Sequence, residues 1–252
     1  MAEPGPLLEY LLRLGDNCLI LGHRLSEWCG HAPVLEEDIA LANVALDLIG
    51  QASHLLRLAG TVEGRGRDED ALAYFRDAID YRNAQLVELP NGDFGHTIVR
   101  SFLFDAGSVL LLDKLQRSTH SELAGIAAKA HKEARYHVRH SGEWVIRLGD
   151  GTDESHRRAQ NALDQLWPYT GELFASDDVD RALAAHAIAP DPPTLQPAWR
   201  EVVTDVIRRA TLTVPTDGYM HSGARQGRHT EHLGHLLAEM QILARSHPGA
   251  KW

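Results

Sequence analysis

Residues 7–28, LLEYLLRLGDNCLILGHRLSEW, indicate the fold class of this chain. Apolar side chains recur along this stretch every three or four residues, which places them on one face of a helix. These positions are Leu7, Leu8, Leu11, Leu14, Cys18, Leu21, Leu25 and Trp28. Gly30 and Pro33 follow and break the pattern. The stretch therefore predicts a long amphipathic helix.

The helical period continues through the rest of the chain, with almost no alternation of the strand type. Glycine and proline clusters separate the periodic segments. The further predicted helices cover residues 36–59, 68–88, 95–117, 121–148, 153–174, 176–186, 195–212 and 230–246. Residues 213–227 are predicted as a loop. Pro168 predicts a kink in helix 153–174, because proline lacks the N–H that an interior helix position donates.

Four of these predicted helices, 7–28, 36–59, 95–117 and 121–148, each exceed twenty residues. Long helices joined by short loops bury their apolar stripes best as an antiparallel bundle. The predicted fold class is all-α, an antiparallel four-helix bundle with additional C-terminal helices. No repeat or composition shift divides the chain, so we expect one domain over residues 1–252. Its core bundle would cover about 5–150 and its C-terminal helices about 153–247.

Composition excludes several classes of protein. With 35 Asp and Glu against 25 Lys and Arg, the formal charge is −10, which argues against a nucleic-acid binder and against docking on an anionic membrane. Two cysteines, Cys18 and Cys29, form no disulfide framework and are expected to be small buried thiols. No uninterrupted apolar run is long enough to span a membrane, and no basic leader precedes residue 7. A cytoplasmic location is expected.

A long four-helix bundle raises the question of a two-metal centre. In carboxylate-bridged di-iron bundles, two helices each give one Glu and two others each give Glu-x-x-His. No Glu-x-x-His pair occurs in the four long helices, and Glu133 is followed three residues later by Tyr136. The candidates for a vestigial site are Asp16, Asn17, Asp47, Asp105, Glu133 and His137. Most carboxylates in this set are Asp, which is shorter than Glu, and the set has one imidazole where a di-iron centre needs two. No metal or other cofactor is therefore expected.

The favoured account of these positions is a network of ion pairs that fills a former metal cavity. Asp105 lies among apolar residues and is expected to be buried, and a buried ionised carboxylate needs a partner. The available cations on the neighbouring helix are Lys129, Lys132 and Arg135. Asp47 has the alternative of a solvated polar stripe with Asn43 and Gln51.

Two further groups of residues could bind ligands. The last helix carries His229, His232 and His235 with Glu231 and Glu239, which could hold zinc or form an ordinary polar helix end. Arg225 and Arg228 lie in a glycine-spaced loop that could receive an anionic group or simply be mobile. In both cases the residues alone favour the ordinary structural role.

Several stretches, in chain order, carry a family resemblance. They are residues 14–19 (LGDNCL), 27–33 (EWCGHAP), 40–43 (ALAN), 46–52 (LDLIGQA), 90–92 (PNG), 132–137 (KEARYH), 149–153 (GDGTD) and 230–234 (TEHLG). Together they resemble the C subunits of the phenylacetyl-CoA epoxidase complex, and they cover nearly the whole chain.

The resemblance implies a ferritin-like bundle within a multi-subunit bacterial monooxygenase of aerobic phenylacetate breakdown. In that complex the A subunit holds the di-iron centre and the thioester substrate, and a reductase delivers electrons from NADPH. The C subunit shares the fold of A, lacks its ligand set, and pairs with A to support it. We therefore expect a non-catalytic structural subunit that binds A and other epoxidase subunits and could dimerise alone. The sequence does not identify the docking face, for which helices 7–28 and 36–59 are candidates.

Two functions of other classes stay open. The chain could itself be a di-iron carboxylate oxygenase that uses Asp16, Asp47, Asp105, Glu133 and His137. It could instead be a binding module for CoA thioesters, with Arg225 and Arg228 at the phosphates.

Overall fold

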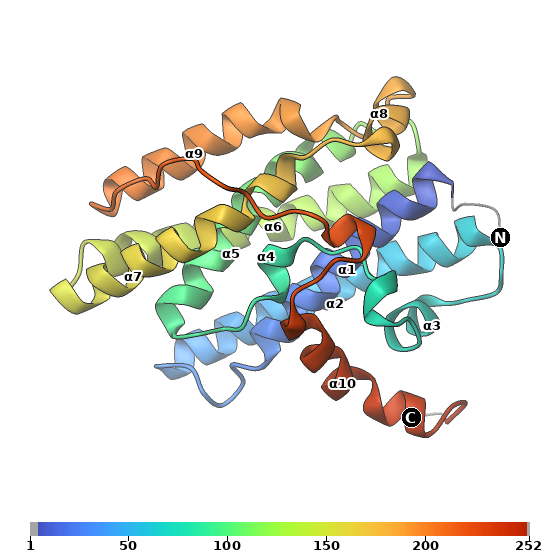
Figure 1. The fold of residues 1–252 in the computed structure, drawn as a ribbon, viewed down its shortest axis with the longest axis horizontal. Coiled ribbons are helices and arrows are strands. Elements are labelled where there is room, and N and C mark those ends of the chain that lie inside the picture. Colours follow the sequence, from blue (N-terminus) through green and yellow to red (C-terminus); the bar gives the residue numbers. More distant parts are fainter. Residues whose placement is uncertain (1–4, 251–252) are drawn as a thin grey trace.

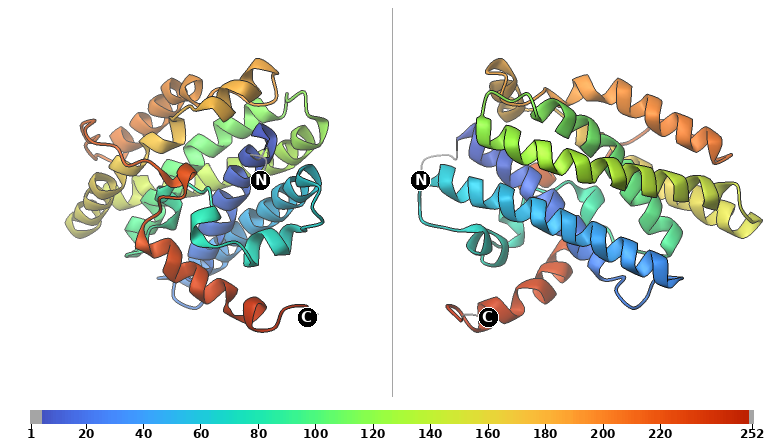
Figure 2. Two further views of the ribbon diagram at one scale, coloured as in Figure 1. Left: turned by 45° about the vertical axis from the view of Figure 1, so that its right-hand side comes forward. Right: turned by 180° about the vertical axis from the view of Figure 1, so that it is seen from behind.

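A computed structural model describes residues 5–250, and every regular element in that part of the chain is helical. The all-α prediction is therefore confirmed. Residues 1–4 and 251–252, the two ends of the predicted domain, lie outside the described residues. The longest helices are α1 (Pro6–Ser26), α2 (Leu35–Glu63), α5 (Phe94–Leu115) and α6 (Ser121–Gly149), and they form two consecutive hairpins (Figures 1 and 2).

The four long helices bury most of the apolar core. Short loops join α1 to α2 and α5 to α6, so the partners in each hairpin are antiparallel. The two hairpins meet where α2 and α6 run alongside each other, as the view from behind shows (Figure 2). Within α1 only the first and last residues, Pro6 and Ser26, are exposed, so this helix lies inside the molecule. The predicted bounds of these four helices differ from the observed ones by a few residues.

One predicted helix, residues 68–88, is wrong. The chain forms instead α3 (Glu69–Tyr74), the 3-10 turn η1 (Ala78–Asp80) and the short α4 (Gln85–Glu88), joined by extended backbone. The physical reason is a set of hydrogen bonds to α1. Asp16 Oδ2 accepts from the backbone N–H of Arg82 at 2.8 Å, and Asn17 Oδ1 accepts from that of Ala84 at 2.8 Å. Both N–H groups would otherwise bond within a helix.

The C-terminal third adds helices to the outside of the bundle. They are α7 (Asp153–Leu166), η2 (Trp167–Tyr169), η3 (Gly171–Phe174), α8 (Asp178–Ala185), η4 (Pro192–Leu195), α9 (Gln196–Arg209), η5 (Ala224–Gln226) and α10 (Glu231–Ser246). Pro168 does not kink a continuing helix as predicted. It ends α7, and a 3-10 turn follows, because a proline there removes the N–H that the next turn would need.

Trp199 anchors α9 to the second hairpin. Its indole Nε1 donates to the carbonyl of Leu103 on α5 at 3.0 Å, and its ring lies 5.6 Å from that of Trp167. Irregular chain then crosses back to the first hairpin, where α10 packs against α3 and α4 (Figure 1). The predicted loop over 213–227 is confirmed apart from η5.

Judged by length and composition alone, α2 could cross a membrane, since its most apolar window has a mean hydropathy of 1.4. In the folded chain 44% of that window is buried, and one such helix is weak evidence. Some of the apolar side chains of α2, among them Leu41, Leu48 and Leu55, pack in the bundle core, and others are exposed.

Gly60, in the last turns of α2, packs closely against residues 67–68, which follow the end of the helix. A Cβ at this position would lie 2.0 Å from the carbonyl oxygen of Arg67. Gly50, ten residues earlier in the same helix, has open space where its Cβ would be. Substituting Gly60 therefore tests the steric contact, and substituting Gly50 tests helix propensity alone.

We expect Gly60→Ala to lower the free energy of unfolding by about 2 kcal/mol or more, because the backbone must shift to admit the methyl group. The matched control, Gly50→Ala, should raise it by up to about 1 kcal/mol, since alanine is the better helix former. Urea denaturation followed by circular dichroism measures both values. Equal effects of the two substitutions would contradict the close approach at Gly60.

Candidate functional site

Polar side chains of α2, α5 and α6 meet in the middle of the bundle. His137 on α6 is buried, and its Nε2 lies 3.0 Å from Asp47 Oδ2 on α2. The side chain of Asp47 is 38% exposed, so this pair joins the interior to the surface. One helical turn further along α6, His140 Nε2 lies 2.9 Å from Glu37 Oε2. Each imidazole on this face of α6 is thus matched with one carboxylate of α2.

Asp105 on α5 lies on the inner side of this group. Its Oδ2 accepts a hydrogen bond from the hydroxyl of Ser141 at 2.8 Å, and the same hydroxyl contacts the carbonyl of His137 at 2.9 Å. Burial raises the pKa of Asp105 to about 6, although nearby His137 and the Ser141 hydrogen bond act in the opposite direction. The expected pairing with Lys129, Lys132 or Arg135 is wrong, because all three are exposed on the outer face of α6.

Glu133 has a different partner. Its Oε2 accepts from Nε2 of Gln51 at 2.9 Å, and the thiol of Cys18 lies 3.7 Å from Oε1 of the same glutamine. Burial, followed by the negative charges of Glu133 and Asp16, raises the pKa of the Cys18 thiol to about 12. The thiol is therefore protonated at neutral pH and unreactive. Cys29, also predicted to be buried, is exposed beyond the end of α1.

Asp16 and Asn17 bond to the segment 75–84 that follows α3. The carboxylate of Asp16 forms a buried ion pair with Arg76, whose Nη1 lies 3.0 Å from Oδ2. The Arg76 side chain also donates to the carbonyls of Leu72 and Asp80. Nothing in the local sequence around Arg76 marked it as a partner for Asp16, since the two are sixty residues apart.

The six vestigial-site candidates therefore lie in separate groups. Asp47, His137 and Asp105 gather in one place, Glu133 lies one turn of α6 away, and Asp16 and Asn17 bond elsewhere. Each has at least one hydrogen-bond partner within the chain, which leaves no open set of donors converging on one point. Over residues 5–250, no three His, Cys, Asp or Glu side chains are grouped so that they could hold a metal ion. The residues do not fit a two-metal centre, which requires about four carboxylates and two imidazoles.

The histidines near the last helix are dispersed as well. His229 Nδ1 lies 2.8 Å from Glu88 Oε2, and its Nε2 lies 3.0 Å from the carbonyl of Tyr81. Burial alone would lower the pKa of His229, but the hydrogen bond and charge of Glu88 outweigh it and raise that pKa. With both nitrogens bonded to acceptors, His229 has no lone pair for zinc. His235 is exposed on α10.

Arg225 is also occupied. Its Nη1 donates to Oδ2 of Asp180 at 2.9 Å and to the carbonyl of Ala175 at 2.7 Å. Arg228 is exposed, and its backbone carbonyl accepts from the Gln85 side chain. The two arginines are not presented together to an anionic group, so the geometry gives no support to a phosphate site at this loop.

Asp105→Asn is expected to raise the free energy of unfolding at neutral and alkaline pH. A carboxyl whose pKa is about 6 in the folded state and 3.8 otherwise binds its proton more tightly when folded. Stability from this group is therefore lost as the pH rises through that window. Asparagine cannot ionise, so the variant should gain about 3 kcal/mol over the parent at high pH and little near pH 4. Urea unfolding of both proteins at several pH values measures the difference, and a gain independent of pH would contradict the raised pKa.

Comparison with known proteins identifies the family of this chain. Residues 2–252 match the family described as phenylacetic acid catabolic protein. The chain is 52% identical over 246 residues to the C subunit of the 1,2-phenylacetyl-CoA epoxidase of Escherichia coli (strain K12), a match that covers 98% of this chain and 99% of that protein. The all-α bundle is the ferritin-like fold of this family. The chain belongs to the phenylacetic acid catabolic protein family.

Proposed function

We propose that this chain, acting as one helical domain over residues 1–252, is a non-catalytic C-type subunit of a 1,2-phenylacetyl-CoA epoxidase. It pairs with the catalytic A subunit in the cytoplasm and supports it. The likeness to the Escherichia coli protein supports the assignment to the complex. The observation that carries the non-catalytic role is the buried ion pair of Asp16 with Arg76, a cation from outside the candidate set.

The donor chemistry supports this role in detail. A carboxylate that bridges two metal ions must offer both oxygens to them, whereas Asp16 uses both oxygens on Arg76 and one of them also on the N–H of Arg82. Glu133 and Asp105 accept from neutral donors, Gln51 and Ser141, which fit ordinary structural hydrogen bonds. On this proposal the group is the remnant of a two-metal site in which Arg76 compensates the charge of Asp16, and Glu133 and Asp105 accept hydrogen bonds from the protein itself.

Metal analysis and co-expression test this proposal. The chain, purified without a histidine tag, should contain well below one iron, and the A subunit should be more soluble and more active when it is co-expressed with this chain than when it is alone. About two irons per chain would favour the di-iron oxygenase instead, because that is the content of a filled centre. An A subunit that is soluble and fully active by itself would contradict the supporting role.

The structure offers a face for such pairing on α2. Of the two candidate helices for docking, α1 lies inside the bundle, so it cannot serve. The outer face of α2 and the residue before it expose a row of large apolar side chains: Val34, Leu35, Ile39 and Leu46. Helix α6 runs alongside α2 (Figure 2), and its residues Lys129, Lys132, Arg135 and Arg139 are exposed. An apolar row with a charged border is the usual composition of a stable protein interface.

Leu46→Glu and Ile39→Glu are each expected to weaken binding to the A subunit by at least tenfold, because a charge would be buried in the apolar centre of the contact. The folded chain alone should be little affected, since these side chains are 67% and 54% exposed. Ile242→Glu on α10, at a site 65% exposed, is the matched control and should bind A normally. Titration by surface plasmon resonance measures all three. Loss of binding by the α10 variant alone would place the docking face elsewhere.

A further inference from the structure

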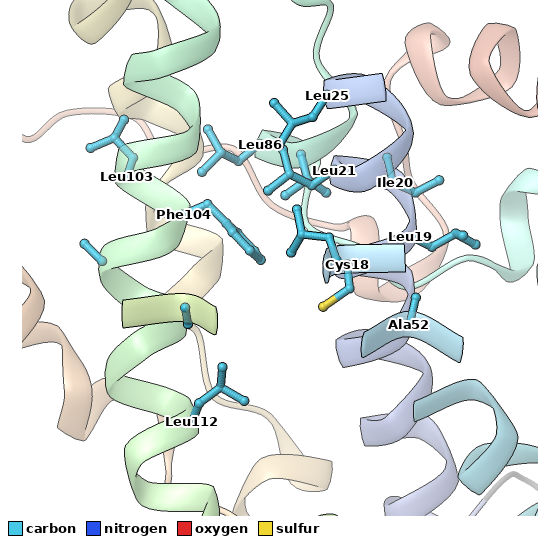
Figure 3. Packing of buried hydrophobic residues seen from close by; sticks show 14 of the residues in the cluster. Cys18, Leu19, Ile20, Leu21, Leu25, Ala52, Leu86, Leu103, Phe104 and Leu112 are labelled. Atoms are coloured by element: carbon cyan, nitrogen blue, oxygen red, sulfur yellow. The ribbon is translucent and has the colours of Figure 1, made fainter. Parts of the chain in front are cut away.

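A cavity of about 100 Å³ lies between the two hairpins and the segment that leads into α8 and η4. Its wall is mostly apolar and is formed by side chains of α5 and α6, among them Phe104, Leu112, Leu115, Leu123 and Ile126. Cys18 lines it from α1. Figure 3 shows Phe104 and Leu112 of α5 directed toward the same space as Cys18. No part of the proposed supporting role uses this cavity.

Two residues of the cavity wall carry buried polar atoms without partners. The hydroxyl of Tyr10 has no hydrogen-bond partner among the described residues, and neither has Oδ1 of Asp180. Tyr10 is 4% exposed and Asp180 1%, so solvent does not compensate these atoms from outside. A buried polar atom left without a partner is costly. Because Tyr10 and Asp180 both line the cavity, a molecule bound there could form hydrogen bonds with both atoms.

An ion-pair cluster lies at this end of the cavity. Oδ2 of Asp180 accepts from Arg225 at 2.9 Å and from Arg13 at 3.3 Å. Arg13 also pairs with Asp177 at 2.7 Å. Burial, and then the charge of Asp180, raises the pKa of Tyr10, so its hydroxyl keeps its proton and can donate. The oxygens of Glu172, another carboxylate of the wall, accept from the backbone N–H groups of Gln85, Gly223 and Ala224. A neutral guest that both donates and accepts would satisfy the two atoms that have no partner.

We propose that this cavity binds a small neutral hydroxyl compound of at most one ring, such as a phenol or a cyclic alcohol. Its hydroxyl donates to Oδ1 of Asp180 and accepts from the hydroxyl of Tyr10, while its ring contacts the apolar wall. The volume of about 100 Å³ is smaller than the roughly 150 Å³ of an apolar cavity that takes up benzene, so a single small ring is the upper limit of size. The site would be separate from any docking face on α2.

Phenol and toluene form the test, because they have nearly the same shape and differ in the hydroxyl. A purely apolar cavity prefers toluene, since phenol must give up hydrogen bonds to water. Calorimetry of the full-length chain should instead show phenol binding at least as tightly as toluene. Tyr10→Phe should weaken phenol binding at least fivefold and leave toluene binding unchanged. Because the hydroxyl it removes has no partner, this variant should unfold at the same temperature as the parent or higher.

Tyr81→Phe is the matched control. Tyr81 is equally buried, but its hydroxyl donates to the carbonyl of Ala73, and the residue does not line the cavity. This variant should lose thermal stability and bind phenol like the parent. Absence of heat with either compound at millimolar concentration would overturn the proposal. A clear preference for toluene, or phenol binding unaffected by Tyr10→Phe, would do the same.

Discussion

A buried carboxylate near the middle of α1 needs a partner for its charge, and much of this structure depends on how that partner is supplied. Asp16 is fully enclosed, and an unpaired charge in that position would cost several kcal/mol. Arg76 and the backbone N–H of Arg82 supply the compensation. To reach Asp16, the chain after α3 must leave the helical conformation and cross α1 in an extended form.

That crossing segment in turn receives the C-terminal part of the chain. The carbonyls of Ala73 and Arg76 accept from the side chain of Gln241 on α10, and the carbonyl of Tyr81 accepts from His229. His229 is also paired with the buried Glu88 of α4. The position of α10 thus depends on contacts that begin with Asp16, more than two hundred residues away. Buried polar groups, each needing a partner, link the two ends of the chain.

The same requirement bears on function. In the bundle centre, Asp47, Asp105 and Glu133 bond to His137, Ser141 and Gln51, all from the chain itself. Because these carboxylates have hydrogen-bond partners within the chain, the bundle can keep the fold of its family without metal ions. The surface of the bundle carries the apolar row of α2. Its interior contains the cavity where the Tyr10 hydroxyl and Oδ1 of Asp180 have no partner among the described residues. Both features agree with the supporting role that we propose.

The four long helices and the all-α class were predictable from the amino-acid sequence, because the apolar period within each helix is a local property. The absence of Glu-x-x-His pairs from these helices and the family resemblance could also be read from the sequence. Other features depend on contacts between segments that are distant in the chain. Residues 68–88 have a helical pattern, yet Asp16 and Asn17, distant in sequence, take the hydrogen bonds that would have made them one helix. Which partner a buried carboxylate finds depends on which chain segments meet: Asp16 pairs with Arg76, and Asp105 accepts from Ser141 instead of pairing with Lys129 or Arg135. Spacing along the sequence does not encode that.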